Sequence, residues 1–231
     1  MWDDATPVTD RPHRYDFHAH TYLTDGSSSA TDMWRHADRL GHRVLAITDH
    51  VSLDDPKPLL DRLRAEARAW EGSPMRTVIG VELTLVPPAR LADAARTARR
   101  AGAELVIVHG ESIVEPVPAG TNRAALDAPE VDLLAHPGLL SEADAELAVA
   151  HDKVLEISGR RGHALGNGRV AARAVAAGAT LVVDSDAHDP AELLPYALAE
   201  RIAAGAGLTT DGVRAALADG PRRLLTRLGT R

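Results

Sequence analysis

The sequence predicts an α/β protein built on a parallel sheet, with seven strands that alternate with helices. Short runs of β-branched and aliphatic residues alternate with stretches of helical periodicity, which is the pattern of βαβ crossovers. The chain has 231 residues and is 45% apolar, and α/β barrels of this length commonly form a single unit. We therefore expect residues 1–231 to form one domain, with 1–13 as a flexible or peripheral N-terminal segment.

The predicted strands are short and rich in Val, Leu and Ile, and polar residues or glycine follow each of them. They span residues 15–19, 43–48, 77–81, 105–108, 131–135, 154–158 and 180–183. Because a helical stretch follows every strand, the strands should run parallel, and their carboxyl ends should open on the same face.

The predicted helices show apolar residues at helical spacing. In the first of them, residues 30–40, the apolar side chains fall on one face and Gly41 marks the end. Gly102 and Gly178 likewise mark the ends of two later helices. The remaining helices are predicted at 59–70, 88–101, 123–126, 142–151, 168–177, 191–204 and 211–228.

Candidate metal ligands stand at the ends of six of the seven predicted strands. His18 and His20 are two residues apart, so their imidazoles point to the same face of a strand and can bind one divalent ion. The other strand ends carry His50, Glu82, His109, His136, Asp186 and His188. Since the carboxyl ends of parallel barrel strands share a face, we expect one buried cluster that binds several metal ions.

Composition narrows the classes of function. The chain has no cysteine, which excludes thiolate metal sites and leaves histidine and carboxylate as the side-chain ligands. The formal net charge is −7 and no run of Lys and Arg suggests a basic face, so nucleic acid is not expected as a partner. The N-terminal residues are not a signal peptide and no apolar run could span a membrane, so we expect a cytoplasmic protein.

The strand-end motifs resemble the PHP family, named for polymerase and histidinol phosphatase, from about Tyr15 to the end of the chain. The resemblance implies a distorted (β/α)7 barrel with two or three divalent ions (Zn, Mn or Fe) and hydrolysis of phosphoesters. Asp25, in the Thr24-Asp25-Gly26 turn, resembles a further ligand of the family. By position, the resemblance assigns as ligands His18, His20, Asp25, His50, Glu82, His109, His136, Asp186 and His188.

The charge of such a cluster favours phosphate. Glu82, Asp186 and Asp25 supply three negative charges, so two or three divalent ions leave an excess of about one to three positive charges, which suits a phosphate dianion. A water shared by two ions becomes a hydroxide nucleophile near neutral pH, and Asp186 or His188 would assist proton transfer. We therefore predict a phosphatase of a small phosphorylated metabolite, such as histidinol phosphate, a nucleotide or a sugar phosphate.

Substrate-binding residues are predicted in two loops. The loop after the sixth strand carries Arg160, Arg161 and His163, with Asn167 shortly after them. Arg123 follows the fourth strand, near the start of a helix. A guanidinium matches phosphate oxygens with a planar fork, so these arginines are candidates to hold the substrate phosphate.

Two aspartates adjoin the ligand positions. Asp49 precedes His50, and Asp184 lies two residues before Asp186. We expect them to orient imidazoles through hydrogen bonds, with turn or cap formation as the alternative.

Two other classes of function fit parts of the pattern. An amidohydrolase-type C–N or ester hydrolase also uses a His-x-His motif, but many such enzymes bridge their ions with a carboxylated lysine, and Lys57 and Lys153 lie away from the strand ends. A non-catalytic, metal-binding regulatory domain is the third class. The complete ligand set argues against it.

Overall fold

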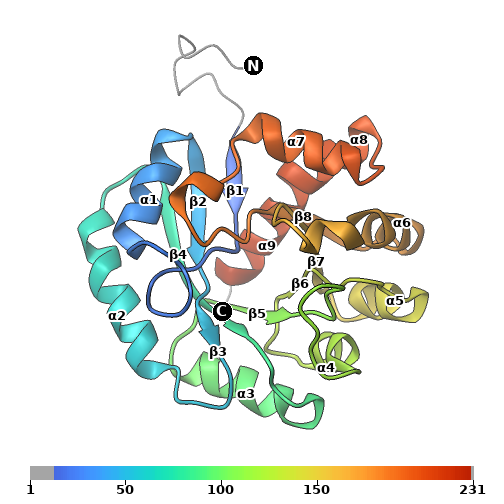
Figure 1. Cartoon of the computed structure of the whole chain (residues 1–231), viewed down its shortest axis with the longest axis horizontal. Helices are drawn as coiled ribbons and strands as arrows, with labels where there is room; N and C mark the ends of the chain where they lie inside the picture. Colours follow the sequence, from blue (N-terminus) through green and yellow to red (C-terminus); the bar gives the residue numbers. More distant parts are fainter. Residues whose placement is uncertain (1–12, 230–231) are drawn as a thin grey trace.

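The computed structural model describes residues 13–229, so the segment predicted at 1–13 lies outside the described residues except for His13. Seven parallel strands form a nearly closed barrel with the helices outside it (Figure 1). The barrel strands follow in the order β1 (Arg14–Asp16), β2 (His42–Ile47), β4 (Arg76–Leu83), β5 (Leu105–His109), β6 (Leu133–Ala135), β7 (Val154–Ser158) and β8 (Thr180–Asp184). A parallel bridge between Ala19 and Ala187 brings the first and last strands together. The predicted (β/α)7 barrel is confirmed.

The helices follow the strands along the chain, as the alternating pattern predicted. A two-residue strand, β3 (His50–Val51), also pairs with β4. The helices are α1 (Ala30–Arg39), α2 (Lys57–Ala67), α3 (Pro88–Arg100), α4 (Thr121–Asp127), α5 (Glu142–Ala150), α6 (Asn167–Ala177), α7 (Tyr196–Gly205), α8 (Thr210–Arg214) and α9 (Gly220–Gly229). A π-helical turn, Ala215–Asp219, joins α8 to α9.

Side chains alternate between the two faces of the barrel strands, as the two-residue period of a strand requires. In β2, Val44 and Ala46 belong to the apolar cluster inside the barrel. Leu45 and Ile47 belong to the larger cluster between the strands and the helices. The hydrophobic core therefore has two layers, and the barrel wall separates them.

The last helix closes one end of the barrel. Leu224 and Leu228 of α9 join the inner apolar cluster. Arg227 donates a hydrogen bond of 2.6 Å to the backbone oxygen of Asp132, just before β6 begins. Helix α9 therefore covers the amino ends of the strands. The carboxyl ends of the strands lie at the opposite end of the barrel, which is left free to form a site.

Several predicted boundaries differ from the structure by a few residues; the first strand, for example, ends at Asp16 and not at Ala19. Two of the differences have a clear local reason. The helix predicted at 191–204 is broken: a short 3-10 turn, Pro190–Glu192, precedes α7, which begins at Tyr196. Pro195 explains the break, because proline has no N–H donor and disfavours helical geometry in the residue before it. Glu82 lies within β4, which continues to Leu83, because β3 extends the sheet beside it.

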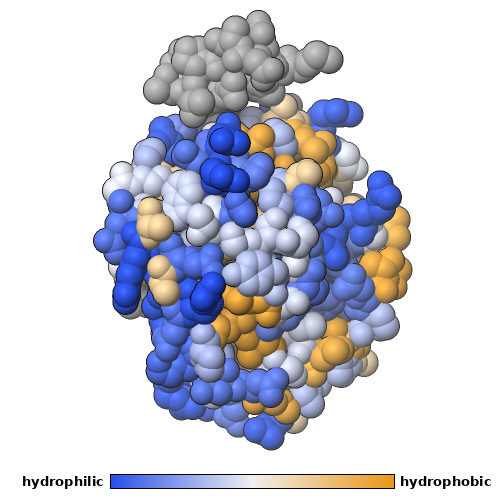
Figure 2. Space-filling model, turned by 60° about the vertical axis from the view of Figure 1, so that its left-hand side comes forward, coloured by the Kyte–Doolittle hydropathy of each residue, from blue (hydrophilic) through white to orange (hydrophobic). Residues whose placement is uncertain are grey.

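The face that carries α1 and α2 is largely hydrophilic (Figure 2). Among the residues drawn there in colour, apolar side chains form small patches separated by polar ones, as on many protein surfaces. Within residues 13–229, no helix combines the length and apolar character needed to cross a membrane.

Candidate metal centre

All nine predicted ligands lie at the carboxyl end of the barrel. Each of them belongs to a group of three or more His, Asp or Glu side chains whose ligand atoms lie within 4.8 Å of one another. Most of these side chains are buried, and Asp25, His50 and His188 form the more accessible edge. The strand ends therefore bring together the donor atoms of a multi-ion cluster, as the motif spacing predicted.

Two of the predicted ligands have strained backbones. His136 has a φ of 25° and Asp186 a φ of 52°, in a region that residues with a side chain rarely adopt. Such strain persists only where the surrounding structure holds it, and it concentrates at functional sites.

Glu82 and Asp186 face a first pair of imidazoles. The Nε2 atoms of His18 and His20 lie 3.3 and 3.4 Å from Oε2 of Glu82. The same nitrogens lie 3.5 and 3.3 Å from Oδ1 of Asp186. One oxygen of each carboxylate thus joins two imidazole nitrogens in what we call the first donor group.

The other oxygens of the two carboxylates face a second pair of imidazoles. Oε1 of Glu82 lies 3.4 Å from Nδ1 of His109 and 3.4 Å from Nε2 of His136. Oδ2 of Asp186 lies 3.6 Å from the same His136 nitrogen. Glu82 is therefore positioned to bridge the first donor group to this second one.

Asp25, His50 and His188 form a third donor group at the open edge. Oδ2 of Asp25 lies 3.3 Å from Nε2 of His50 and 3.1 Å from Nε2 of His188. The His20 ring packs against both imidazoles, with centroids 4.3 and 4.2 Å away. Asp25 is a candidate ligand in this geometry, and its side chain is half exposed.

The separations and the unpaired atoms in the first two groups fit divalent ions. Two ligands at the usual 2.0–2.1 Å from one tetrahedral ion lie about 3.4 Å apart, which is longer than an ordinary hydrogen bond. Within the described part of the chain, Nε2 of His18, both ring nitrogens of His20 and Oε1 of Glu82 are buried without a hydrogen-bond partner, while Oε2 of Glu82 also lies 2.9 Å from Nδ1 of His50. Buried polar atoms are rarely left in this state, so the donor set fits metal binding.

Hydrogen bonds to the opposite ring nitrogens hold the imidazoles in place. Nδ1 of His18 lies 2.7 Å from Oε2 of Glu156, and both side chains are fully buried. Nε2 of His109 lies 3.3 Å from the backbone oxygen of Glu115. Such partners fix the orientation of a metal-binding imidazole. Our sequence reasoning missed Glu156, although its signal was a lone carboxylate within an apolar strand.

The cluster favours ionised carboxylates, which are the form that binds metal. Burial alone would raise the pKa of Glu82, but the facing imidazoles, led by His18 and His50, lower it well below its ordinary value. Burial would likewise lower the pKa of His18, but the carboxylates of Asp186 and Glu82 raise it well above its ordinary value.

A model of the PHP domain matches residues 16–157. The chain belongs to the PHP domain family. An uncharacterized protein of Methanocaldococcus jannaschii is 38% identical over 93% of this chain and 100% of its own length. Ribonuclease P protein component 3 of Methanosarcina mazei is 30% identical over 61% of this chain, which spans only 56% of that relative.

Solved structures share the barrel of this PHP domain at low sequence identity. Histidinol phosphate phosphatase of Lactococcus lactis, solved with zinc, L-histidinol and phosphate, matches with a TM-score of 0.58 at 14% identity over 94% of both chains. A Xaa-Pro dipeptidase matches with a TM-score of 0.63 at 12% identity over 95% of this chain and 76% of its own. These similarities show the fold alone.

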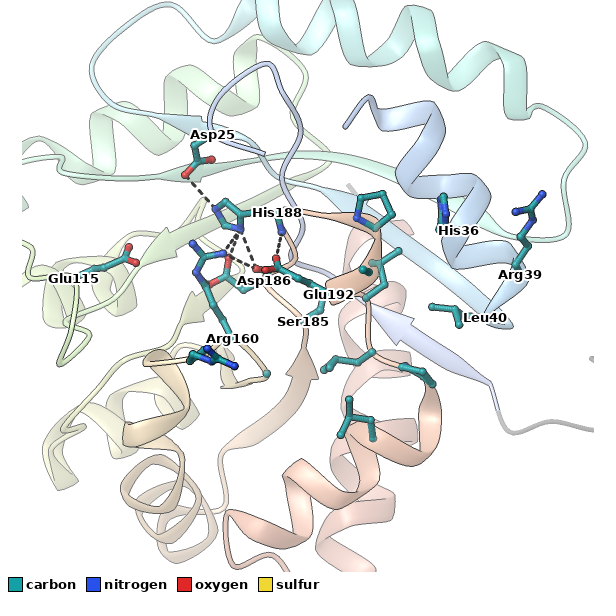
Figure 3. Close-up of a pocket in the computed structure, with 18 residues that line it drawn as sticks. Asp25, His36, Arg39, Leu40, Glu115, Arg160, Ser185, Asp186, His188 and Glu192 are labelled. Carbon is teal, nitrogen blue, oxygen red and sulfur yellow. Dashed lines mark hydrogen bonds and ion pairs between the residues drawn. The ribbon is translucent and has the colours of Figure 1, made fainter. Parts of the chain in front are cut away.

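Arg160 and Arg161 line a cavity of about 1240 Å³ that opens beside the cluster of this PHP domain. Arg160 donates a 3.3 Å hydrogen bond to the backbone oxygen of Asp186 and contacts Nδ1 of His188 (Figure 3). Arg161 is exposed. Both arginines thus line the same cavity as Asp25, Asp186 and His188.

Two predicted substrate residues have other roles in the PHP domain. Both ends of the Asn167 amide bond to the backbone of Ser158, at 3.0 Å to its nitrogen and 2.8 Å to its oxygen. Asn167 therefore holds the loop after β7, and its side chain is buried. Arg123 pairs with Asp127 on the same helix at 3.2 Å and is not among the residues that line the cavity.

Asp49 and Asp184 bond backbone and hydroxyl groups and not imidazoles, so the expected role of orienting imidazoles is corrected, and Asp49 takes the alternative role of holding a turn. Asp49 accepts hydrogen bonds from the backbone and hydroxyl of Thr21, both at 2.7 Å, and from the hydroxyl of Thr24 at 2.8 Å. It thereby holds the turn that presents Asp25. Asp184 accepts a 2.8 Å bond from the backbone of Phe17 and joins the end of β1 to β8.

Proposed function

We propose that this PHP domain is a metal-dependent phosphatase of small phosphorylated metabolites. The observation that carries the proposal is the placement of Glu82: its Oε2 lies 3.3 and 3.4 Å from imidazole nitrogens of His18 and His20, and its Oε1 lies 3.4 Å from those of His109 and His136. This arrangement supports two or three ions, of Zn, Mn or Fe, and an excess of positive charge that favours a phosphate dianion.

Different residues of the chain have different roles in the proposed reaction. When bound, the divalent ions acidify water and neutralise charge on the phosphate. Glu82 and Asp186 fix the spacing of the donor groups, and Glu156 holds the His18 ring in its orientation. Arg160 is fixed beside Asp186 and presents a guanidinium to the cavity, where it would bind and orient phosphate oxygens.

An amidohydrolase-type reaction is supported less well. The structure places both lysines away from the cluster: Lys57 pairs with Asp61 on α2. The Lys153 amine donates to the backbone oxygens of Ala128 and Val131, at 2.6 and 2.7 Å, beside the start of β7. Neither amine is placed to bridge ions as a carboxylated lysine.

A role in a ribonucleoprotein is the second candidate, because ribonuclease P protein component 3 is among the relatives. Binding to RNA depends strongly on basic residues that neutralise phosphates. The net charge of −7 argues against such a role. A gel-shift assay with structured RNA at physiological salt is expected to show no binding.

Purified protein is expected to contain two or three divalent ions per chain and to hydrolyse a generic aryl phosphate. A chelator should abolish turnover and Mn or Zn should restore it, because the proposed chemistry depends on the ions. Elemental analysis of untagged protein and a phosphatase assay check this. One ion or fewer after reconstitution, or amide or lactone hydrolysis without phosphatase activity, would contradict the proposal.

Arg160→Ala or Arg161→Ala is expected to lower kcat/KM for a phosphate ester by about 10- to 150-fold, the effect of losing a charge-assisted hydrogen bond. Ion content should stay normal in Arg161→Ala, whereas Arg160→Ala also removes the partner of Nδ1 of His188 and should loosen the third donor group. Arg123→Ala is a matched control, since that arginine pairs with Asp127 outside the cavity. If both cavity variants stay within about twofold of wild type, the proposed phosphate clamp is wrong.

A further inference from the structure

We propose that Asp49 positions the third donor group, so that one bound ion depends on it and the ions of the other two groups do not. This inference rests on the proposed metal-dependent function and deepens it. Asp49 is completely buried, whereas Asp25, the ligand that it positions, is half exposed at the edge of the cluster. An exposed ligand on a loop is not held by packing of its own side chain, so its geometry must come from the residues that fix the loop.

Asp49 fixes the loop between β1 and α1 on one side of Asp25. Its carboxylate accepts hydrogen bonds from the backbone and the hydroxyl of Thr21, both at 2.7 Å. It also accepts a 2.8 Å bond from the hydroxyl of Thr24, the residue just before Asp25. Hydrogen bonds to a charged acceptor are stronger than neutral ones, so three of them hold this side of the loop firmly.

A second attachment fixes the loop on the other side of Asp25. The backbone nitrogen of Ser27 donates to the backbone oxygen of His188 at 2.7 Å, and the side chains of Asp25 and His188 face each other at the cavity (Figure 3). Each attachment thus joins the loop to a segment that carries another member of the third donor group. Asp49 directly precedes His50, and Ser27 reaches His188 itself.

Gly26 lets the loop turn tightly just after Asp25. Its backbone nitrogen donates to the backbone oxygen of Thr21 at 2.9 Å. A Cβ atom built on Gly26 would lie 2.8 Å from the backbone oxygen of His20 and 2.9 Å from the carbonyl carbon of Thr21. A side chain at this position would displace the loop and leave the carboxylate of Asp49 in place. A substitution of Gly26 therefore tests the position of Asp25 independently.

The backbone that carries His20 is anchored without Asp49. The nitrogen of His20 donates to the backbone oxygen of Ala187 at 2.8 Å, and the oxygen of Ala19 accepts a 2.8 Å bond from the backbone of Thr48. These backbone bonds remain when the side chain of Asp49 is replaced. The first donor group should therefore keep its ion.

The second donor group lies against other loops. His163, which the sequence predicted as a substrate residue, is buried there, and its ring stacks on that of His136 with centroids 4.0 Å apart. Nδ1 of His163 lies 2.6 Å from the hydroxyl of Ser112. These contacts join the loops after β5, β6 and β7, so they remain when the loop after β1 is released.

Two other roles for Asp49 would have different consequences. A role in orienting the His50 ring is already filled by Thr84, whose hydroxyl lies 2.7 Å from Nδ1 of that ring. If Asp49 only stabilised the fold, its replacement would lower the melting temperature and leave every ion bound as in wild type. The number of bound ions at each free-ion concentration separates positioning from stabilisation.

Asp49→Ala, Thr24→Val and Gly26→Ala test the proposal in the full-length protein. Equilibrium dialysis against Mn, followed by elemental analysis, gives the number of ions bound at each free concentration. In Asp49→Ala the concentration that half-fills one site should rise by about 10- to 100-fold, the effect of losing a residue that orients a ligand, while the other sites fill as in wild type. Thr24→Val removes one of the three bonds and should give a smaller shift. Gly26→Ala should shift the same site in the same direction.

Asp144→Ala is the matched control, because Asp144 also bonds a hydroxyl, that of Ser141 at 2.6 Å, but lies outside the donor groups. It should bind Mn as wild type does. Wild-type Mn binding in a folded Asp49→Ala protein would overturn the proposal, and so would an equal loss of affinity at all sites. If Asp49→Ala fails to fold, as judged by thermal melting, unchanged Mn binding in both Thr24→Val and Gly26→Ala would overturn it.

These measurements do not depend on turnover. Protein that binds its ions without hydrolysing phosphate esters would refute the proposed function and leave the positioning role of Asp49 standing. Protein that hydrolyses phosphate esters, with one site that fills equally well in wild type and in all three variants, would refute the positioning role alone.

Discussion

Glu82→Gln is expected to lower phosphatase kcat/KM by at least about 1000-fold, equivalent to a loss of about 4 kcal/mol of transition-state stabilisation. Both oxygens of this buried carboxylate face imidazole nitrogens, Oε2 toward His18 and His20 and Oε1 toward His109 and His136. An amide carries no charge and offers a single acceptor oxygen, so it cannot join the two donor groups. The number of bound ions should fall together with the activity.

Steady-state kinetics and elemental analysis of the same preparation check this prediction. Glu104→Gln is the matched control, because it makes the same chemical change just before the start of β5, beside Arg76. We expect the control to keep wild-type ion content and activity. A Glu82→Gln protein that binds its full complement of ions and stays within about tenfold of wild-type activity would refute the bridging role.

The metal ligands at the strand ends could be predicted because their positions follow from the local sequence pattern. Period-two geometry places His18 and His20 on one face, and parallel strands bring all carboxyl ends to one side of the barrel. Glu156 could not be assigned in this way. A lone carboxylate in an apolar strand faces either the barrel interior or the helices, and the choice depends on how β7 pairs with its neighbours.

The hydrogen-bond and ion-pair partners of individual side chains were harder to predict than the positions of the metal ligands. Asn167 and Arg123 have the right chemistry for phosphate and lie in suitable loops, yet one bonds the backbone of Ser158 and the other pairs with Asp127. These partners are set by the tertiary positions of loop and helix, which no local pattern encodes. Tertiary packing also decides that the two oxygens of Glu82 face different donor groups.

Removal of the bound ions is expected to lower the melting temperature by about 10–30 °C. An ion present at 100 times its Kd stabilises the folded state by about 2.7 kcal/mol, so two or three ions contribute about 5–8 kcal/mol. In a chain of this length, each kcal/mol shifts the melting temperature by about 2–4 °C. The structural reason is that the first two donor groups bury several nitrogens and oxygens that lack hydrogen-bond partners in the described part of the chain.

Differential scanning calorimetry of ion-loaded, chelator-treated and reconstituted protein measures this effect. Reconstitution should restore the higher melting temperature, which separates ion loss from irreversible damage. The Glu82→Gln variant should respond less to the chelator than wild type, because it begins with fewer bound ions. If ion-free protein melts within about 2 °C of the loaded form, the buried donors are satisfied without metal, and the fit of the cluster to divalent ions would have to be abandoned.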